Sequence, residues 1–243
     1  MRSALLTAVV CGVLVAGCAA RVAEVPARAA TPTDALPEQV YRSASTRGEA
    51  VYTVDAATSI VAIEVRRAGS LARLGHDHVV ASHDVRGYVW PGGGQADLSV
   101  RLDRLAVDEP ALRQAAGFDT TPTPEAIDAT RHNMLEKTLE AERYPLALIA
   151  VRAVDRDAFD PRRLRTSTDV DVSITLHGVQ RELRVPVTLE RSGPVLQITG
   201  TVGFAQSAFG ITPLAVLGGA IQVQDQVDVR FGIRAVRPDS PID

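Results

Sequence analysis

The alternation of apolar and polar side chains in its last long segment constrains the fold of this chain most strongly. Nearly every second residue is apolar, and the apolar set is Val223, Val227, Val229, Phe231, Ile233 and Ala235. Successive side chains of a β-strand point to opposite faces, so a strand with this pattern is buried on one side only. The segment therefore predicts a half-buried strand.

The same alternation recurs in the middle of the chain, on both sides of a short turn over 177–180. The apolar residues of these two runs are Val170, Val172, Ile174 and Leu176, then Leu183, Val185, Val187 and Leu189. Two alternating runs joined by a short turn that contains glycine predict a β-hairpin. Further strands are expected over 51–65, 98–102, 146–154 and 196–202.

One short helix is expected between the strands. Thr123 is suited to cap its N-terminus, Pro124 to occupy the first helical position, and Glu125 to favour the positive end of the helix dipole. The apolar stripe of this helix is Ile127, Met134 and Leu135. Their spacing places these three side chains on one face of a helix.

The pattern as a whole predicts an all-β fold of antiparallel strands, which must either pack as a sandwich or close into a barrel. The inward side chains are mostly aliphatic, and aromatic residues make up only 4% of the sequence. A barrel lined in this way can be hollow and hold a small ligand. The candidate lining residues are Val170, Val172, Ile174, Leu176, Val227, Val229, Phe231 and Ile233. A filled core is the alternative that the pattern leaves open.

Residues 1–17 have the character of a signal peptide. Arg2 is the only charged residue among them, and Ala4 to Val15 is an almost unbroken apolar run that is too short to span a bilayer. Small residues then precede Cys18 in the order that resembles a bacterial lipobox, Val15-Ala16-Gly17-Cys18. We therefore expect cleavage before Cys18 and lipidation of its thiol.

Lipidation would explain the cysteine usage. The chain has two cysteines, and Cys11 lies in the predicted signal peptide, so Cys18 would be the only thiol of the exported chain. The acyl chains, such as palmitate, would anchor the protein to a membrane of the cell envelope, facing the periplasm. Ala19 follows the cysteine, which in a Gram-negative cell favours the outer membrane.

Composition divides the rest of the chain. Residues 18–48 are rich in Ala, Pro, Thr and Arg and predict a flexible linker, residues 49–237 carry the strands, and residues 238–243 form a tail. Hydrophobic residues make up 46% of the sequence, enough for one sizeable core. A net charge of −3 and few aromatic residues exclude a nucleic-acid-binding footprint.

Five short strings resemble a known family, the YceI-like, polyisoprenoid-binding domain of bacterial periplasmic proteins. In chain order they lie at 51–55, 131–135 with Tyr144-Pro145, 176–181, 185–187 and 207–211. The resemblance implies a lipocalin-like antiparallel barrel that encloses an apolar channel for a long isoprenoid, quinone-like or fatty chain, and it implies binding rather than catalysis. Gln206 and Ala208 stand where family members often carry an arginine and an acidic residue, which puts a charged head-group contact in doubt.

Two histidines of the string Gly75-His76-Asp77-His78 are the candidate polar contacts near one end of the barrel. If both lie on one strand, His76 and His78 share a face. The alternative is a metal site completed by a third ligand such as His83, since zinc and copper suit imidazole. His132 and His177 are expected to be an exposed residue and a turn residue.

No enzyme signature accompanies these features. The sequence contains no G-x-S-x-G elbow, no phosphate-cradling glycine loop and no catalytic cysteine. Three functions follow in order of preference: an envelope lipoprotein that binds an apolar ligand for carriage or storage, a metal-binding or redox-supporting protein, and a filled barrel for protein interaction. The sequence does not fix the oligomeric state, and a dimer sharing an edge strand is one arrangement.

Overall fold

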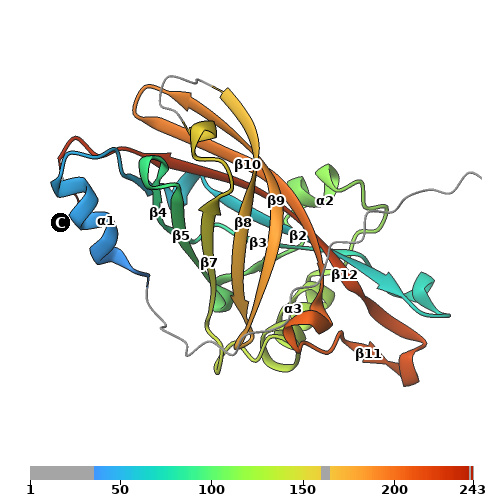
Figure 1. The fold of residues 1–243 in the computed structure, drawn as a ribbon. Coiled ribbons are helices and arrows are strands. Elements are labelled where there is room, and N and C mark those ends of the chain that lie inside the picture. Colours follow the sequence, from blue (N-terminus) through green and yellow to red (C-terminus); the bar gives the residue numbers. More distant parts are fainter. Residues whose placement is uncertain (1–35, 160–164, 241, 243) are drawn as a thin grey trace, which may run out of the picture.

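A computed structural model describes residues 36–159, 165–240 and 242. The predicted signal peptide and Cys18 lie outside these residues. Figure 1 shows a barrel of strands with helices at its periphery. The helices and strands are α1 (Glu38–Thr46), β1 (Tyr52–Val54), β2 (Ile60–Ala68), β3 (His78–Ser82), β4 (Val85–Trp90), β5 (Gln95–Arg101), β6 (Ala106–Val107), α2 (Pro110–Ala115), α3 (Pro124–Asn133), β7 (Leu146–Ala153), β8 (Arg165–Leu176), β9 (Val179–Ser192), β10 (Val195–Ala205), β11 (Ala215–Val216) and β12 (Ile221–Val236).

The strands form one antiparallel sheet that closes on itself, which confirms the predicted barrel. Eight strand paths make the barrel wall. Three of these paths each consist of two short strands that follow one another along the wall: β1 and β2, β3 and β4, and β5 and β6. The last strand closes it: β12 pairs with β10 along one edge and with β1 and β2 along the other. Closure thus occurs within one chain.

The predicted hairpin is the pair β8 and β9. Its turn consists of His177 and Gly178, both with positive φ (52° and 72°), the backbone that a two-residue turn needs to match the twist of its strands. A side chain at position 178 would meet the ring of Tyr144 at 2.8 Å. Glycine is therefore required there by both backbone and packing.

The predicted helix is α3. The Thr123 hydroxyl accepts a hydrogen bond from the backbone N–H of Ala126 at 3.3 Å, and Pro124 begins the helix, as expected. The helix continues as a π-helical turn over Met134–Thr138. Met134 and Leu135 pack with Val80 and other residues of the barrel wall. Within the described ranges, the helices lack the combination of length and apolar character that crossing a bilayer requires.

Two helices beyond the expected one, α1 and α2, are also present. The expectation of a flexible linker through residue 48 is wrong for Glu38–Thr46, which form α1. This helix has little sequence signal, since only Tyr41 and Ala44 are fully buried and no side chain caps its start. It lies against the outside of the barrel next to the C-terminus (Figure 1), where the Ser45 hydroxyl accepts a hydrogen bond from the N–H of Ile242.

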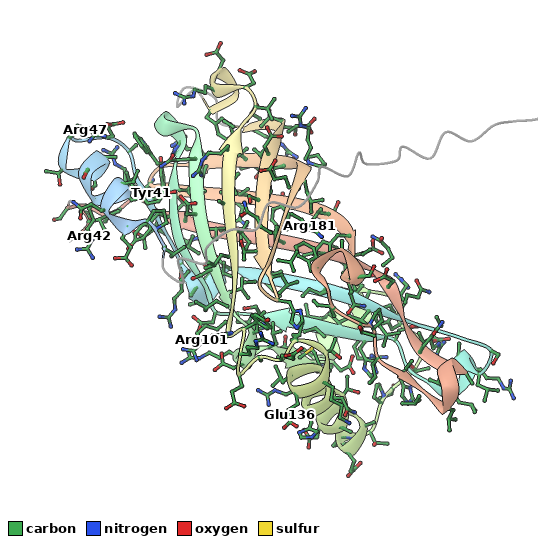
Figure 2. The ribbon with its side chains drawn as sticks, turned by 60° about the horizontal axis from the view of Figure 1, so that its bottom comes forward. Tyr41, Arg42, Arg47, Arg101, Glu136 and Arg181 are labelled. Carbon is green, nitrogen blue, oxygen red and sulfur yellow. The ribbon has the colours of Figure 1, made fainter. Side chains whose placement is uncertain are left out.

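A buried hydrogen bond fastens α1 to the wall. The Tyr41 hydroxyl donates to Asp97 of β5 at 2.5 Å, and its ring stacks on Tyr88 of β4 at a centroid distance of 5.2 Å. Figure 2 shows Tyr41 on the side of α1 that faces the sheet, with Arg42 and Arg47 away from it. Burial and the Asp97 carboxylate raise the pKa of the Tyr41 hydroxyl, so it stays protonated and donates.

Replacing Tyr41 with phenylalanine is expected to lower the free energy of unfolding by about 1–3 kcal/mol, because the buried Asp97 carboxylate loses its donor. Thermal unfolding would measure the change. Val40→Ala, at an exposed position of the same helix, is the control and should unfold like the unchanged protein. Equal midpoints for the two variants would contradict the role given to this bond.

Candidate ligand-binding cavity

The barrel encloses a cavity of about 310 Å³, a volume within the range of small-molecule sites. All eight side chains predicted to face the interior line it: Val170, Val172, Ile174, Leu176, Val227, Val229, Phe231 and Ile233. Their contact with a ligand remains a prediction. A filled core, the alternative left open by the sequence, is contradicted by this cavity.

The cavity extends along most of the barrel. Five residues of β12 from Val223 to Ile233 line it, a span of about 30 Å at roughly 3.3 Å per residue. The aromatic residues among the described lining are Phe159, Phe204 and Phe231, and the remainder is largely aliphatic. Small aliphatic side chains on all walls leave the centre open, so the site has the shape and polarity of a channel for an apolar chain.

The helical segment between β6 and β7 closes a gap in the barrel wall. β6 pairs only with β3, so the wall has no strand on the other side of β6. α3 and the π-helical turn pack there, and Thr130, Met134, Thr138 and Leu139 of this segment line the cavity. The helix predicted from the sequence is therefore part of the cavity wall.

The late loop over 206–211 closes a second gap. The last pair between β9 and β10 is Val187 with Gly200, because the next residue of β9 is Pro186, which has no N–H to donate. Beyond this point the two strands separate. Phe209 is fully buried in the loop, with its ring 5.1 Å from that of Phe204, and Ile211 lines the cavity.

His78 is the predicted polar residue that reaches the cavity. It lies at the start of β3, lines the cavity, and its side chain is 13% exposed. Its Nδ1 lies 2.5 Å from Oδ2 of Asp108. The other oxygen of this carboxylate, Oδ1, accepts from the Val79 N–H at 3.0 Å. The imidazole is thus held in one orientation by a group outside the cavity lining.

Asp108 and Arg113 were not predicted as site residues from the sequence. The Asp108 side chain is fully buried, and Arg113 of α2 donates to its Oδ1 at 2.6 Å. Burial alone would raise the pKa of Asp108, but hydrogen bonds with His78 and Arg113 hold it below its ordinary value. The two residues follow β3 by about thirty positions, and α2, which presents Arg113, has no apolar period to reveal it.

The structure does not assemble the metal site considered from the sequence. β3 begins at His78, so His76 precedes the strand and the two residues do not share a strand face as expected. Their rings lie 6.2 Å apart, and His83 pairs with Glu109 at 2.8 Å. Within the described residues, no three His, Cys, Asp or Glu side chains gather as a metal site.

The two remaining histidines lie outside the cavity lining. His132 pairs with Glu136 on the exposed side of the segment α3 and its π-helical turn. His177 occupies the β8–β9 turn with its Nε2 3.1 Å from Glu140 and its ring beside that of Tyr144. Both positions agree with the expected surface and turn roles.

Solved structures share this fold. A polyisoprenoid binding domain from Saccharophagus degradans, implicated in plant cell wall breakdown, matches with a TM-score of 0.58 and 16% identity, covering 78% of this chain and all of that domain. BcnA from Burkholderia cenocepacia matches with a TM-score of 0.50 and 18% identity, covering 75% of this chain and 99% of BcnA. At these identities the likeness is one of fold. No curated protein sequence matches this chain.

The sequence itself matches the YceI-like domain family over residues 52–235, from β1 to the penultimate residue of β12. This range contains every strand path of the barrel and the cavity that they enclose. The match covers more than half of the chain and agrees with the resemblance of its short motifs. The chain belongs to the family of YceI-like domains.

Proposed function

We propose that this protein binds a long apolar ligand, such as an isoprenoid or fatty chain, in its barrel and carries or stores it in the cell envelope. The observation that carries the proposal is the aliphatic cavity that follows β12 through the barrel. A fold neighbour described as a polyisoprenoid binding domain supports the ligand class. The proposed activity is binding, and no step of catalysis is assigned to the chain.

The energetics favour a chain-like ligand. Each methylene that moves from water into an apolar site contributes about 0.8 kcal/mol, so ten contribute about 8 kcal/mol before the cost of ordering the chain. That gain corresponds to on the order of micromolar affinity. The walls supply this energy without any hydrogen bond to the tail.

Binding is tested by displacement of a fluorescent apolar probe with straight-chain alcohols of increasing length. Affinity is expected to rise by up to about fourfold for each added methylene until the cavity is filled. The full chain carrying Cys18→Ser would be used, so that no acyl anchor is present. An affinity that does not depend on chain length would overturn the proposal.

The second part of the proposal is a lipid anchor at Cys18, supported by the order Val15-Ala16-Gly17-Cys18 after an apolar run. Cys18→Ser is expected to move the protein from the membrane fraction to the soluble periplasmic fraction and to abolish incorporation of a labelled palmitate analogue. Cys11→Ser, within the predicted signal peptide, is the matched control and should remain in the membrane fraction. Labelling of the Cys18→Ser protein would refute the anchor without bearing on ligand binding.

A further inference from the structure

The cavity presents one ionisable side chain to a ligand. Among its described lining residues, His78 alone can carry charge, and the other polar ones are Ser, Thr and Gln. Arg113, which lies on the His78 side of the barrel wall, does not line the cavity. It donates to Asp108, to the backbone oxygen of Asp77 and to that of Thr120. With the His78 ring neutral, a phosphate or carboxylate in the cavity would therefore lose its hydration and meet no cation among the described lining residues.

The hydrogen bond to Asp108 decides which atom of His78 carries the proton. An ionised carboxylate only accepts hydrogen bonds, and the lowered pKa of Asp108 keeps it ionised. Nδ1 must then carry the hydrogen in the 2.5 Å contact. In the neutral ring, Nε2 is left with a lone pair and acts as an acceptor. Among the described residues, Nε2 has no hydrogen-bond partner, whereas Nδ1 does.

The neighbourhood of His78 complements this acceptor. His78 pairs with Val65 across β2 and β3, and Val65 packs in the same apolar cluster as Met134 and Leu139 of the helical segment. Thr130 and Thr138 of that segment also line the cavity, and each hydroxyl can donate as well as accept. The described lining of this largely aliphatic channel thus offers an acceptor on a fixed ring and hydroxyl donors from the helical segment.

We propose that His78, oriented by Asp108 and Arg113, selects ligands whose apolar chain ends in a neutral hydrogen-bond donor, such as an alcohol or a phenol. The ligand hydroxyl would donate to Nε2 of His78, and its oxygen would accept from a threonine hydroxyl. This inference rests on the proposed function and adds the chemical class of the head group. Asp108 and Arg113 are positioning residues, since neither lines the cavity.

The test compares three ligands that share one tail: farnesol, its methyl ether and farnesyl phosphate. Affinity is measured by titration calorimetry at about pH 8, on the full chain carrying Cys18→Ser. Farnesol is expected to bind on the order of tenfold more tightly than the ether, which cannot donate, and more tightly than the phosphate. In His78→Phe, farnesol and the ether should bind with equal affinity.

His78→Gln is the second variant, because its amide oxygen keeps an acceptor on this side of the cavity. It is expected to restore part of the preference for farnesol, and it serves as the test if His78→Phe does not fold. Equal binding of farnesol and its ether by the unchanged protein, or tighter binding of the phosphate, would overturn this inference and leave the proposed function standing. Failure of all three ligands to bind would overturn the proposed function and the head-group assignment together.

Discussion

Replacing Val172 with tryptophan is expected to reduce the affinity for any long apolar chain at least tenfold while leaving the barrel folded. Val172 lies in the middle of β8, between Val151 of β7 and Leu183 of β9, and its side chain lines the cavity. In a filled core such an enlargement would cost about 1–3 kcal/mol through overpacking. Here the indole would occupy the open space that the ligand needs. Probe displacement and thermal unfolding together measure both effects.

The matched control is Asp171→Trp. Asp171 is the preceding residue on the same strand, but its side chain points outward, is 54% exposed and pairs with Arg184. Because neighbouring residues of a strand face opposite sides, the same tryptophan at this position leaves the cavity unchanged. Equal loss of binding in both variants would show that the effect comes from disturbed strands rather than from the cavity.

Replacing Arg113 with alanine is expected to destabilise the protein by about 3–5 kcal/mol, because it leaves the buried Asp108 carboxylate without its cation. For a chain of this size, the loss corresponds to a fall in the unfolding midpoint of about 6–20 °C. Arg184→Ala is the control, since its pair with Asp171 is exposed and contributes no more than about 1 kcal/mol. Similar midpoints for the two variants would contradict a structural role for the buried pair.

The same pair predicts how stability depends on pH. The pKa of Asp108 is lower in the folded chain than its ordinary value of about 3.9 in the unfolded chain. Its contribution is therefore fully present above about pH 5 and is lost as pH falls through the lower, folded pKa. Arg113→Ala removes one group that lowers this pKa, so the contribution of Asp108 should be smaller in the variant and its loss should end at a higher pH, while the onset of the loss, set by the unfolded chain, stays the same. Urea unfolding between about pH 2 and pH 7 would reveal the shift.

The barrel could be predicted from the sequence because buried apolar residues and exposed polar residues alternate along its strands. β8, β9 and β12 show this alternation, and all eight residues predicted to face the interior line the cavity. The hairpin turn and the start of α3 were also predictable, since His177-Gly178 and Thr123-Pro124 act through local backbone preferences. A hollow interior was not decided by this pattern, because filled and hollow barrels share the same alternation.

The helices and side chains that pack around the barrel and orient His78 were not predictable from local sequence patterns. α1 depends on one tyrosine that meets Asp97 across 56 positions, and α2 is six residues long with a single buried side chain, Arg113. His78 was chosen for its residue type, but its partner Asp108 lies thirty positions away in sequence. Contacts of this kind arise when the barrel closes, and a single sequence carries no periodic signal for them.

The most direct test of the account is native mass spectrometry of the full chain carrying Cys18→Ser, exported to the periplasm of a host without added ligand. The account predicts an added mass equal to that of a long-chain apolar molecule, and loss of that mass in the Val172→Trp variant. A bare protein mass for both proteins, with no added mass even after incubation with farnesol, would contradict the claim that this barrel holds an apolar chain.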